Sequence, residues 1–159
     1  MKKYSGILQN LSITDLNEAG FKIAWQKPYC YQNKFDELLQ FLKKKYVIIG
    51  AIEKGKNQLI LAAMGEGKKV FKETKDIKET HEHNKVFWYF MRKKSFGFSE
   101  TENVYLDEID CIESRERREF EKGKLSWCLT ENFGGWRIGD ITDLQDSINY
   151  EKIILIKDD

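Results

Sequence analysis

Two apolar runs of equal length, separated by a short polar segment, constrain the fold of this chain more than any other feature. Residues 46–52 read Tyr-Val-Ile-Ile-Gly-Ala-Ile, and residues 58–64 read Gln-Leu-Ile-Leu-Ala-Ala-Met. The intervening residues 53–57, Glu-Lys-Gly-Lys-Asn, have the composition of a hairpin turn. The pattern therefore predicts an antiparallel β-hairpin.

Further strand-like segments follow, and turn residues separate nearly all of them. Between residues 46 and 112 the sequence leaves no room for repeated strand–helix crossovers, so we expect an antiparallel meander. Two glycines in Asn132-Phe-Gly-Gly135 predict a second hairpin, across which Trp127 and Trp136 would face each other. The remaining predicted strands cover residues 21–25, 69–72, 76–79, 85–92, 104–112, 125–130, 136–141 and 151–157.

The clearest helix pattern covers residues 33–45. Asn33 is placed to cap it, and Phe35, Leu38, Leu39 and Leu42 fall on one face. Shorter helices are predicted for residues 12–19 and 114–122. The predicted fold class is α+β: an antiparallel meander sheet with one main amphipathic helix packed on one face and one or two short helices, in a single domain of residues 1–159.

Charge is distributed unevenly along the chain. Residues 1–98 carry 19 Lys and Arg against 10 Asp and Glu, whereas residues 99–159 carry 8 against 16. Such an asymmetry of charge bears on the choice of binding partner more than on the fold. The chain has 22 lysines and 5 arginines, which favours diffuse electrostatic attraction of a partner over bidentate hydrogen bonding to it. No run is long and apolar enough for a membrane span, and the opening residues lack the apolar core of a secretion signal. We therefore expect a cytoplasmic protein without a membrane partner.

Two motifs resemble sites of phosphate or metal chemistry. Residues 50–57 nearly match the phosphate-binding pattern G-x-x-x-x-G-K-[ST]. However, Asn57 stands where the pattern has a magnesium-binding hydroxyl, and a predicted strand follows where the pattern needs a helix. A hairpin turn is therefore favoured, and no cofactor is expected. His81 and His83 lie on one face of an extended segment, and Glu79 extends that face to a possible metal triad. This triad would suit a small metal-dependent hydrolase or nuclease, although a solvated turn is the simpler interpretation.

Residues 94–101, Lys-Ser-Phe-Gly-Phe-Ser-Glu-Thr, resemble the aromatic strand signature of the RNA recognition motif. On a strand, Phe96 and Phe98 would point the same way and could stack on successive bases of single-stranded RNA. The order of elements expected for that motif is absent, because a hairpin occupies the place of its first helix. The basic residues that would contact phosphate beside these rings are Arg92, Lys93 and Lys94.

Residues 76–92 read as an acidic turn that leads into an aromatic strand ending in Arg92, and residues 129–134 read Leu-Thr-Glu-Asn-Phe-Gly. These two patches resemble a small accessory subunit of type III-D CRISPR effector complexes. The resemblance implies a non-catalytic component that works beside RNA or within an assembly. We therefore predict a non-enzymatic binding or adaptor module for a protein partner or an RNA-containing complex, with direct RNA binding as the alternative. The residues predicted to contact a partner are Arg115, Glu116, Arg117 and Arg118.

Overall fold

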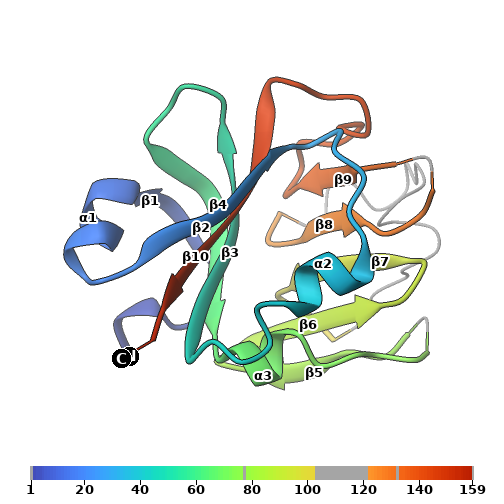
Figure 1. The fold of residues 1–159 in the computed structure, drawn as a ribbon, viewed down its shortest axis with the longest axis horizontal. Coiled ribbons are helices and arrows are strands. Elements are labelled where there is room, and N and C mark those ends of the chain that lie inside the picture. Colours follow the sequence, from blue (N-terminus) through green and yellow to red (C-terminus); the bar gives the residue numbers. More distant parts are fainter. Residues whose placement is uncertain (1, 77, 103–121, 132, 159) are drawn as a thin grey trace.

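The computed structural model describes residues 2–76, 78–102, 122–131 and 133–158 (Figure 1). Within them the chain is mostly β, with 44% strand and 13% helix. The strands are β1 (Leu8–Ser12), β2 (Lys22–Pro28), β3 (Tyr46–Glu53), β4 (Gln58–Gly65), β5 (His81–His83), β6 (Val86–Met91), β7 (Ser95–Ser99), β8 (Leu125–Cys128), β9 (Gly135–Ile138) and β10 (Tyr150–Lys157). The helical segments are η1 (Lys2–Tyr4), α1 (Ile13–Glu18), α2 (Phe35–Leu39) and α3 (Gly67–Val70).

The strands form two five-stranded antiparallel sheets. The first has the order β1-β4-β3-β10-β2, so the C-terminal strand β10 lies between β3 and β2. The second follows the chain in the order β5-β6-β7-β8-β9. The hairpin predicted for residues 46–64 is confirmed as β3 and β4, whereas the meander is confined to the second sheet.

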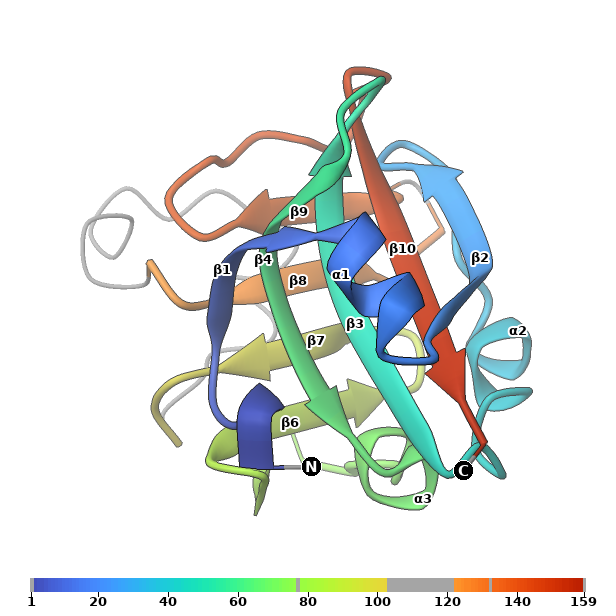
Figure 2. The same cartoon turned by 90° about the vertical axis from the view of Figure 1, so that its left-hand side faces the viewer.

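The main core fills the space between the sheets, whose strands run across one another (Figures 1 and 2). Phe96 of β7 lies at its centre. The Phe96 ring stacks on Phe71 at 5.2 Å and approaches Phe90 at 5.2 Å and Trp127 at 5.4 Å. Burying one such aromatic side chain stabilises the fold by about 1.5–3 kcal/mol, so this cluster is a large part of what holds the two sheets together.

The opposite face of the first sheet is buried as well. Figure 2 shows α1 lying over this face, where Ile13 and Leu16 enter a second core. Ser12 caps α1 by accepting a hydrogen bond from the Asp15 N–H at 3.3 Å, which confirms the short helix predicted for residues 12–19. Because both faces are covered, β3 and β4 read as nearly continuous apolar runs. The sheet residues of this second core are Ile48, Ile52, Leu59, Ala62, Met64, Ile153 and Leu155.

The predicted α+β class with a main helix over residues 33–45 is wrong. Among the described residues no helix reaches seven residues, and α2 has only five. The Asn33 side chain does not cap this helix, because its Oδ1 accepts from Lys152 Nζ at 2.6 Å. Its Nδ2 donates to the carbonyls of Cys128 at 2.9 Å and Gly134 at 2.7 Å. The apolar face was nevertheless placed correctly, since Phe35 and Leu38 are buried.

The helix ends early because the residues after it pack on α3. The Gly67 N–H donates to the Lys44 carbonyl at 2.9 Å. A Cβ at position 67 would lie 2.6 Å from the Phe41 carbonyl and 2.9 Å from the Leu42 carbonyl. Residues 40–45 therefore form a loop against the α3 backbone, and Lys43 and Lys45 are exposed on the surface.

A buried lysine fastens the segment between β2 and α2 to the rest of the molecule. Lys152 of β10 is fully buried. Its Nζ donates to the Tyr31 carbonyl at 2.5 Å, to Asn33 Oδ1 at 2.6 Å and to the Gly134 carbonyl at 3.0 Å. These three acceptors match the three protons of an ammonium group, while burial lowers the pKa of Lys152 well below its ordinary value. The contacts join the β2–α2 loop, β10 and the β8–β9 turn.

The hairpin predicted around the two glycines is confirmed as β8 and β9, but its register is asymmetric. Trp127 pairs with Gly135 across an irregularity in the ladder, so it does not lie opposite Trp136. The two tryptophans belong to different apolar clusters, and the predicted cross-strand pair is wrong. Glycine is needed at position 135 because a Cβ there would lie 2.5 Å from the Tyr29 ring.

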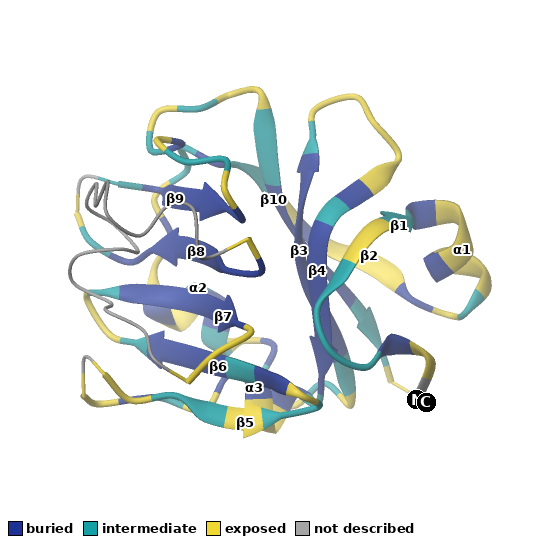
Figure 3. Cartoon of the chain, turned by 180° about the vertical axis from the view of Figure 1, so that it is seen from behind, coloured by how far each residue is buried: buried dark blue, intermediate teal, exposed yellow. Residues whose placement is uncertain are grey.

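Exposure is concentrated in α1, the edge strand β2 and the turns, whereas most other strands are buried (Figure 3). Among the described residues, only Ile23 and Ile148 are large hydrophobic side chains that are exposed. Within these same ranges, the helices are all too short or too polar to cross a lipid bilayer.

Candidate functional site

A cleft of about 680 Å³ lies where the start of β3, the end of β4 and the β5–β6 turn meet. The start of β3 and the end of β4 lie at the opposite end of this hairpin from its turn at residues 54–57 (Figure 2). Tyr46 and Met64 supply the larger apolar side chains of the cleft, and the other lining groups are polar or charged. The full lining is Ser5, Lys45, Tyr46, Met64, Gly65, Glu66, His83, Asn84 and Lys85.

The β5–β6 turn forms one wall of this cleft. His83 pairs with Val86, which leaves Asn84 and Lys85 as the two turn residues. Their φ angles are 56° and 63°, as a type I′ turn requires at both central positions. Asparagine tolerates this conformation, whereas a lysine in it carries about 1–2 kcal/mol of backbone strain. Lys85 is thus both the strained residue of the turn and the one that presents a charge at the cleft.

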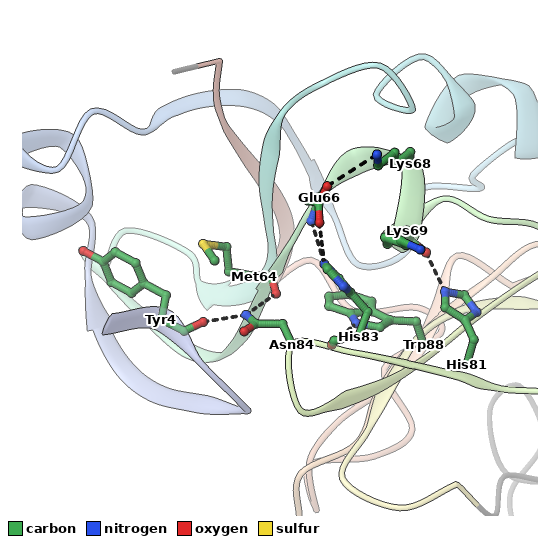
Figure 4. A network of polar contacts seen from close by, with 9 residues as sticks. All are labelled: Tyr4, Met64, Glu66, Lys68, Lys69, His81, His83, Asn84 and Trp88. Carbon is green, nitrogen blue, oxygen red and sulfur yellow. Dashed lines mark hydrogen bonds and ion pairs between the residues drawn. The ribbon is translucent and has the colours of Figure 1, made fainter. Parts of the chain in front are cut away.

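The Asn84 side chain joins three segments of the chain around the cleft (Figure 4). Its Nδ2 donates to the Tyr4 carbonyl at 2.8 Å and to the Met64 carbonyl at 2.9 Å. Its backbone carbonyl accepts from the Gly6 N–H at 3.0 Å. The wall is therefore tied both to the segment after η1 and to the end of β4.

Two histidines of β5 contact the backbone of the α3 segment (Figure 4). His83 Nε2 accepts from the Glu66 N–H at 3.0 Å, and His81 Nε2 lies 2.5 Å from the Lys69 carbonyl. Since an N–H only donates, His83 must carry its proton on Nδ1; since a carbonyl only accepts, His81 must carry its proton on Nε2. The partners thus fix the rings in opposite tautomers.

Burial lowers the pKa of both histidines. At His83 the Glu66 carboxylate, 4.0 Å from Nε2, opposes this shift, while the positive charge of Lys69 and the neighbouring His81 reinforce it. The neutral imidazole is therefore the favoured form beside the cleft, as its hydrogen bond from an N–H also requires.

Lysines dominate the rim of the cleft and continue beyond it. A second hollow of about 530 Å³ adjoins the first, and the two share Lys45 and Glu66. We call the two hollows together the groove. Among the residues that the structure describes, its lining contains one acidic residue, Glu66, and five lysines: Lys43, Lys44, Lys45, Lys68 and Lys85.

The acidic groups near the groove neutralise only part of this charge. Lys44 Nζ lies 3.4 Å from the Asp158 carboxylate, and Lys68 Nζ lies 3.8 Å from that of Glu66. Lys45 Nζ instead lies 5.6 Å from the centre of the Tyr46 ring, within the range of a cation–π contact. The groove is therefore a basic surface with an aromatic ring in it.

Phe96 and Phe98 do not lie at this groove. Neither has any exposed surface, because both point into the core between the sheets, where Phe98 meets Trp88 edge to face at 5.5 Å. Gly97 between them is equally enclosed, since a Cβ there would collide with the Leu125 carbonyl. Neither ring is available to stack on a base, which corrects the prediction of an exposed aromatic pair.

The basic residues predicted beside those rings form the β6–β7 turn, at the opposite end of β6 from the Asn84–Lys85 turn. The Arg92 guanidinium lies 4.0 Å over the Phe35 ring. It also approaches the carboxylates of Asp36 at 3.8 Å and Glu73 at 3.6 Å. Protein groups thus already engage Arg92; Lys93 is exposed and Lys94 half-buried.

Glu79 does not join His81 and His83 to form the predicted triad. Its Oε1 accepts from the N–H groups of Lys75 at 2.8 Å and Asp76 at 3.2 Å. No three or more His, Cys, Asp or Glu side chains come close enough to hold a metal ion within the described ranges. The residues predicted to contact a partner lie outside the described residues: Arg115, Glu116, Arg117 and Arg118.

The sequence patterns do not predict the groove, because its residues fit other roles. Residues 43–45 continue the predicted helix, and Tyr46 begins an apolar strand-like run. One wall of the groove did have a signal in the sequence: Asn84 and Lys85 directly follow a short extended segment, and such a pair is compatible with a two-residue turn. No sequence rule brings that turn beside Glu66, because the contact depends on how the two sheets meet.

Comparisons with known proteins add no relative: no family model, curated protein or solved structure matches this chain. The likeness of residues 76–92 and 129–134 to an accessory subunit of type III-D CRISPR complexes therefore stays a prediction.

Proposed function

We propose that this chain is a non-enzymatic binding module that holds an anionic macromolecule along the groove. The observation that carries the proposal is the charge of the lining, in which, within the described part of the chain, five lysines accompany a single acidic residue. Lysine side chains attract phosphates or carboxylates without demanding one geometry, which suits a polymer with repeated charges.

The groups that could transfer protons in the groove have structural roles, which favours binding over catalysis. His83 uses Nε2 to accept the Glu66 N–H, and the Glu66 carboxylate lies beside both Lys68 and His83. A general base needs a free lone pair within hydrogen-bond reach of its substrate. His83 would have to release α3 before it could serve as one.

The experiment compares the groove with a matched basic site elsewhere on the protein. A labelled single-stranded RNA of about 12 nucleotides and a labelled acidic peptide are titrated with protein and followed by fluorescence anisotropy. Lys45→Ala/Lys85→Ala should weaken binding of the anion by about tenfold or more, and affinity should fall steeply with salt. Lys54→Ala/Lys56→Ala, at the exposed β3–β4 turn, should bind as the wild type does.

Two results would contradict the proposal. One is that neither the RNA nor the acidic peptide binds at about 0.15 M salt or below. The other is equal loss of affinity in the two double variants, which would mean that net charge and not the groove determines binding.

A further inference from the structure

The shape of the groove indicates what kind of anionic polymer it takes. Its two hollows have volumes of about 680 and 530 Å³ and meet at Lys45 and Glu66. Each lies within the roughly 300–1,000 Å³ of a site for one small molecule, so a continuous pair suits consecutive units of a chain. The ligand is thus expected to run along the groove with one unit in each hollow.

The first hollow offers more than charge. Its accessible apolar group is Tyr46, which is half-buried, whereas Met64 is only 4% exposed and belongs to the second core. Lys45 and Lys85 are exposed in the same lining. A flat, apolar group flanked by negative charges matches this arrangement, and a nucleotide base between backbone phosphates is such a group.

We infer that the groove binds single-stranded nucleic acid, with one unpaired base against Tyr46 and the neighbouring phosphates at Lys45, Lys68 and Lys85. This inference rests on the proposed function, whose partner class it names. A base inside a duplex is stacked on its neighbours and could not enter the hollow, so the ligand must be unpaired.

Glu66 distinguishes this ligand from a plain polyanion. Its carboxylate lies where the two hollows meet and accepts hydrogen bonds but donates none. It repels phosphates and carboxylates, yet it can accept from the N–H groups on a base edge. Inorganic polyphosphate has no such donors, so Glu66 favours a strand that carries bases over a plain polyanion.

The test compares four probes of matched length: a mixed-sequence single strand, an abasic sugar-phosphate strand, a duplex and inorganic polyphosphate. The single strand should bind about tenfold more tightly than each of the others, as one base–aromatic stack provides. With three phosphates neutralised, the slope of log affinity against log salt should be about −2.

Variants of Tyr46 and Glu66 separate stacking from charge. Tyr46→Leu should remove most of the preference for the single strand over the abasic strand, whereas Tyr46→Phe should keep it. Glu66→Gln should raise the affinity for polyphosphate and reduce the preference for strands with bases. A thermal melt of each variant confirms that the fold is intact.

The outcomes distinguish the inference from the proposed function. If the abasic strand, the duplex or polyphosphate binds as tightly as the single strand, the inference is overturned while the groove remains an anion site. If Tyr46→Phe loses the preference as Tyr46→Leu does, stacking at Tyr46 is overturned. If none of the probes binds and an acidic peptide does, the partner class is wrong although the proposed function stands.

Discussion

The backbone N–H of Glu66 donates a hydrogen bond to Nε2 of His83 at a distance of 3.0 Å. This contact requires a neutral ring, because a protonated imidazole carries a hydrogen on both nitrogens and cannot accept. Protonation would leave two donors facing each other and bring a positive charge toward the Glu66 carboxylate, now 4.0 Å away. The contact between β5 and α3 is therefore sensitive to pH.

Acidification should destabilise the protein through its two histidines. Burial lowers the folded-state pKa of both, so the unfolded chain takes up protons first as the pH falls. The contribution of the two histidines to the free energy of unfolding is complete above the unfolded-state pKa of about 6.5. It is lost as the pH falls from there toward their lowered pKa in the folded state. Urea unfolding should show a lower midpoint at about pH 5.5 than at about pH 7.5.

The double variant His81→Gln/His83→Gln tests whether these rings are responsible. A glutamine amide can donate to the Lys69 carbonyl and accept from the Glu66 N–H, but it does not titrate. The difference between the two pH values should shrink in this variant. An unchanged difference would assign the pH dependence to other groups.

Lys152→Met should destabilise the fold strongly. The substitution keeps the side chain as far as its ε carbon but removes the ammonium group. The carbonyls of Tyr31 and Gly134 and the Asn33 amide oxygen then lack their shared donor. Losing buried hydrogen bonds of this kind costs on the order of 3 kcal/mol in the free energy of unfolding, measured by chemical denaturation.

A second lysine on the same strand provides the control. Lys157 Nζ donates to the Ala19 carbonyl at 2.6 Å, but this side chain is only half-buried, so water can replace it. Lys157→Met should therefore cost less than about 1 kcal/mol. Equal effects at the two positions would contradict a special role for the buried ammonium.

Local patterns identified individual elements correctly but not their assembly. The hairpin of residues 46–64 was readable because a polar, glycine-containing turn separates two apolar runs, and Ser12 was readable as a helix cap. The helix over residues 33–45 was overpredicted because its apolar spacing continues to Leu42. Asn33 instead bonds Lys152, more than a hundred residues away in sequence, and no local rule foresees that.

Non-local packing also explains why the site was misplaced. Phe96 and Phe98 had the spacing of a stacking platform, but the second sheet uses the same alternation to fill the core between the layers. Without the first sheet covering that face, the two interpretations look alike. The groove could not be anticipated, since Lys45, Glu66 and Lys85 come together only where the sheets meet.

Lys85→Gly should stabilise the protein and weaken its binding of an anion. Glycine adopts the φ of 63° without strain, which should raise the free energy of unfolding by about 1 kcal/mol, while the groove loses a charge. Thermal denaturation and anisotropy titration measure the two effects. Opposite signs are expected because strain at this turn holds the charge in place.

Lys93→Gly is the matched control, since Lys93 has a φ of 64° but lies in the β6–β7 turn. It should stabilise the protein to a similar degree without changing its affinity. If Lys93→Gly weakens binding as much as Lys85→Gly does, net charge and not the groove determines the affinity.

The most direct test of the groove as the binding site is an amide chemical-shift titration of the isotope-labelled protein with a single-stranded oligonucleotide. The largest shifts should occur at Gly65, Glu66, Asn84 and Lys85, while the turn at residues 54–57 stays unchanged. Shifts that avoid these four amides and gather elsewhere on the protein would contradict the account.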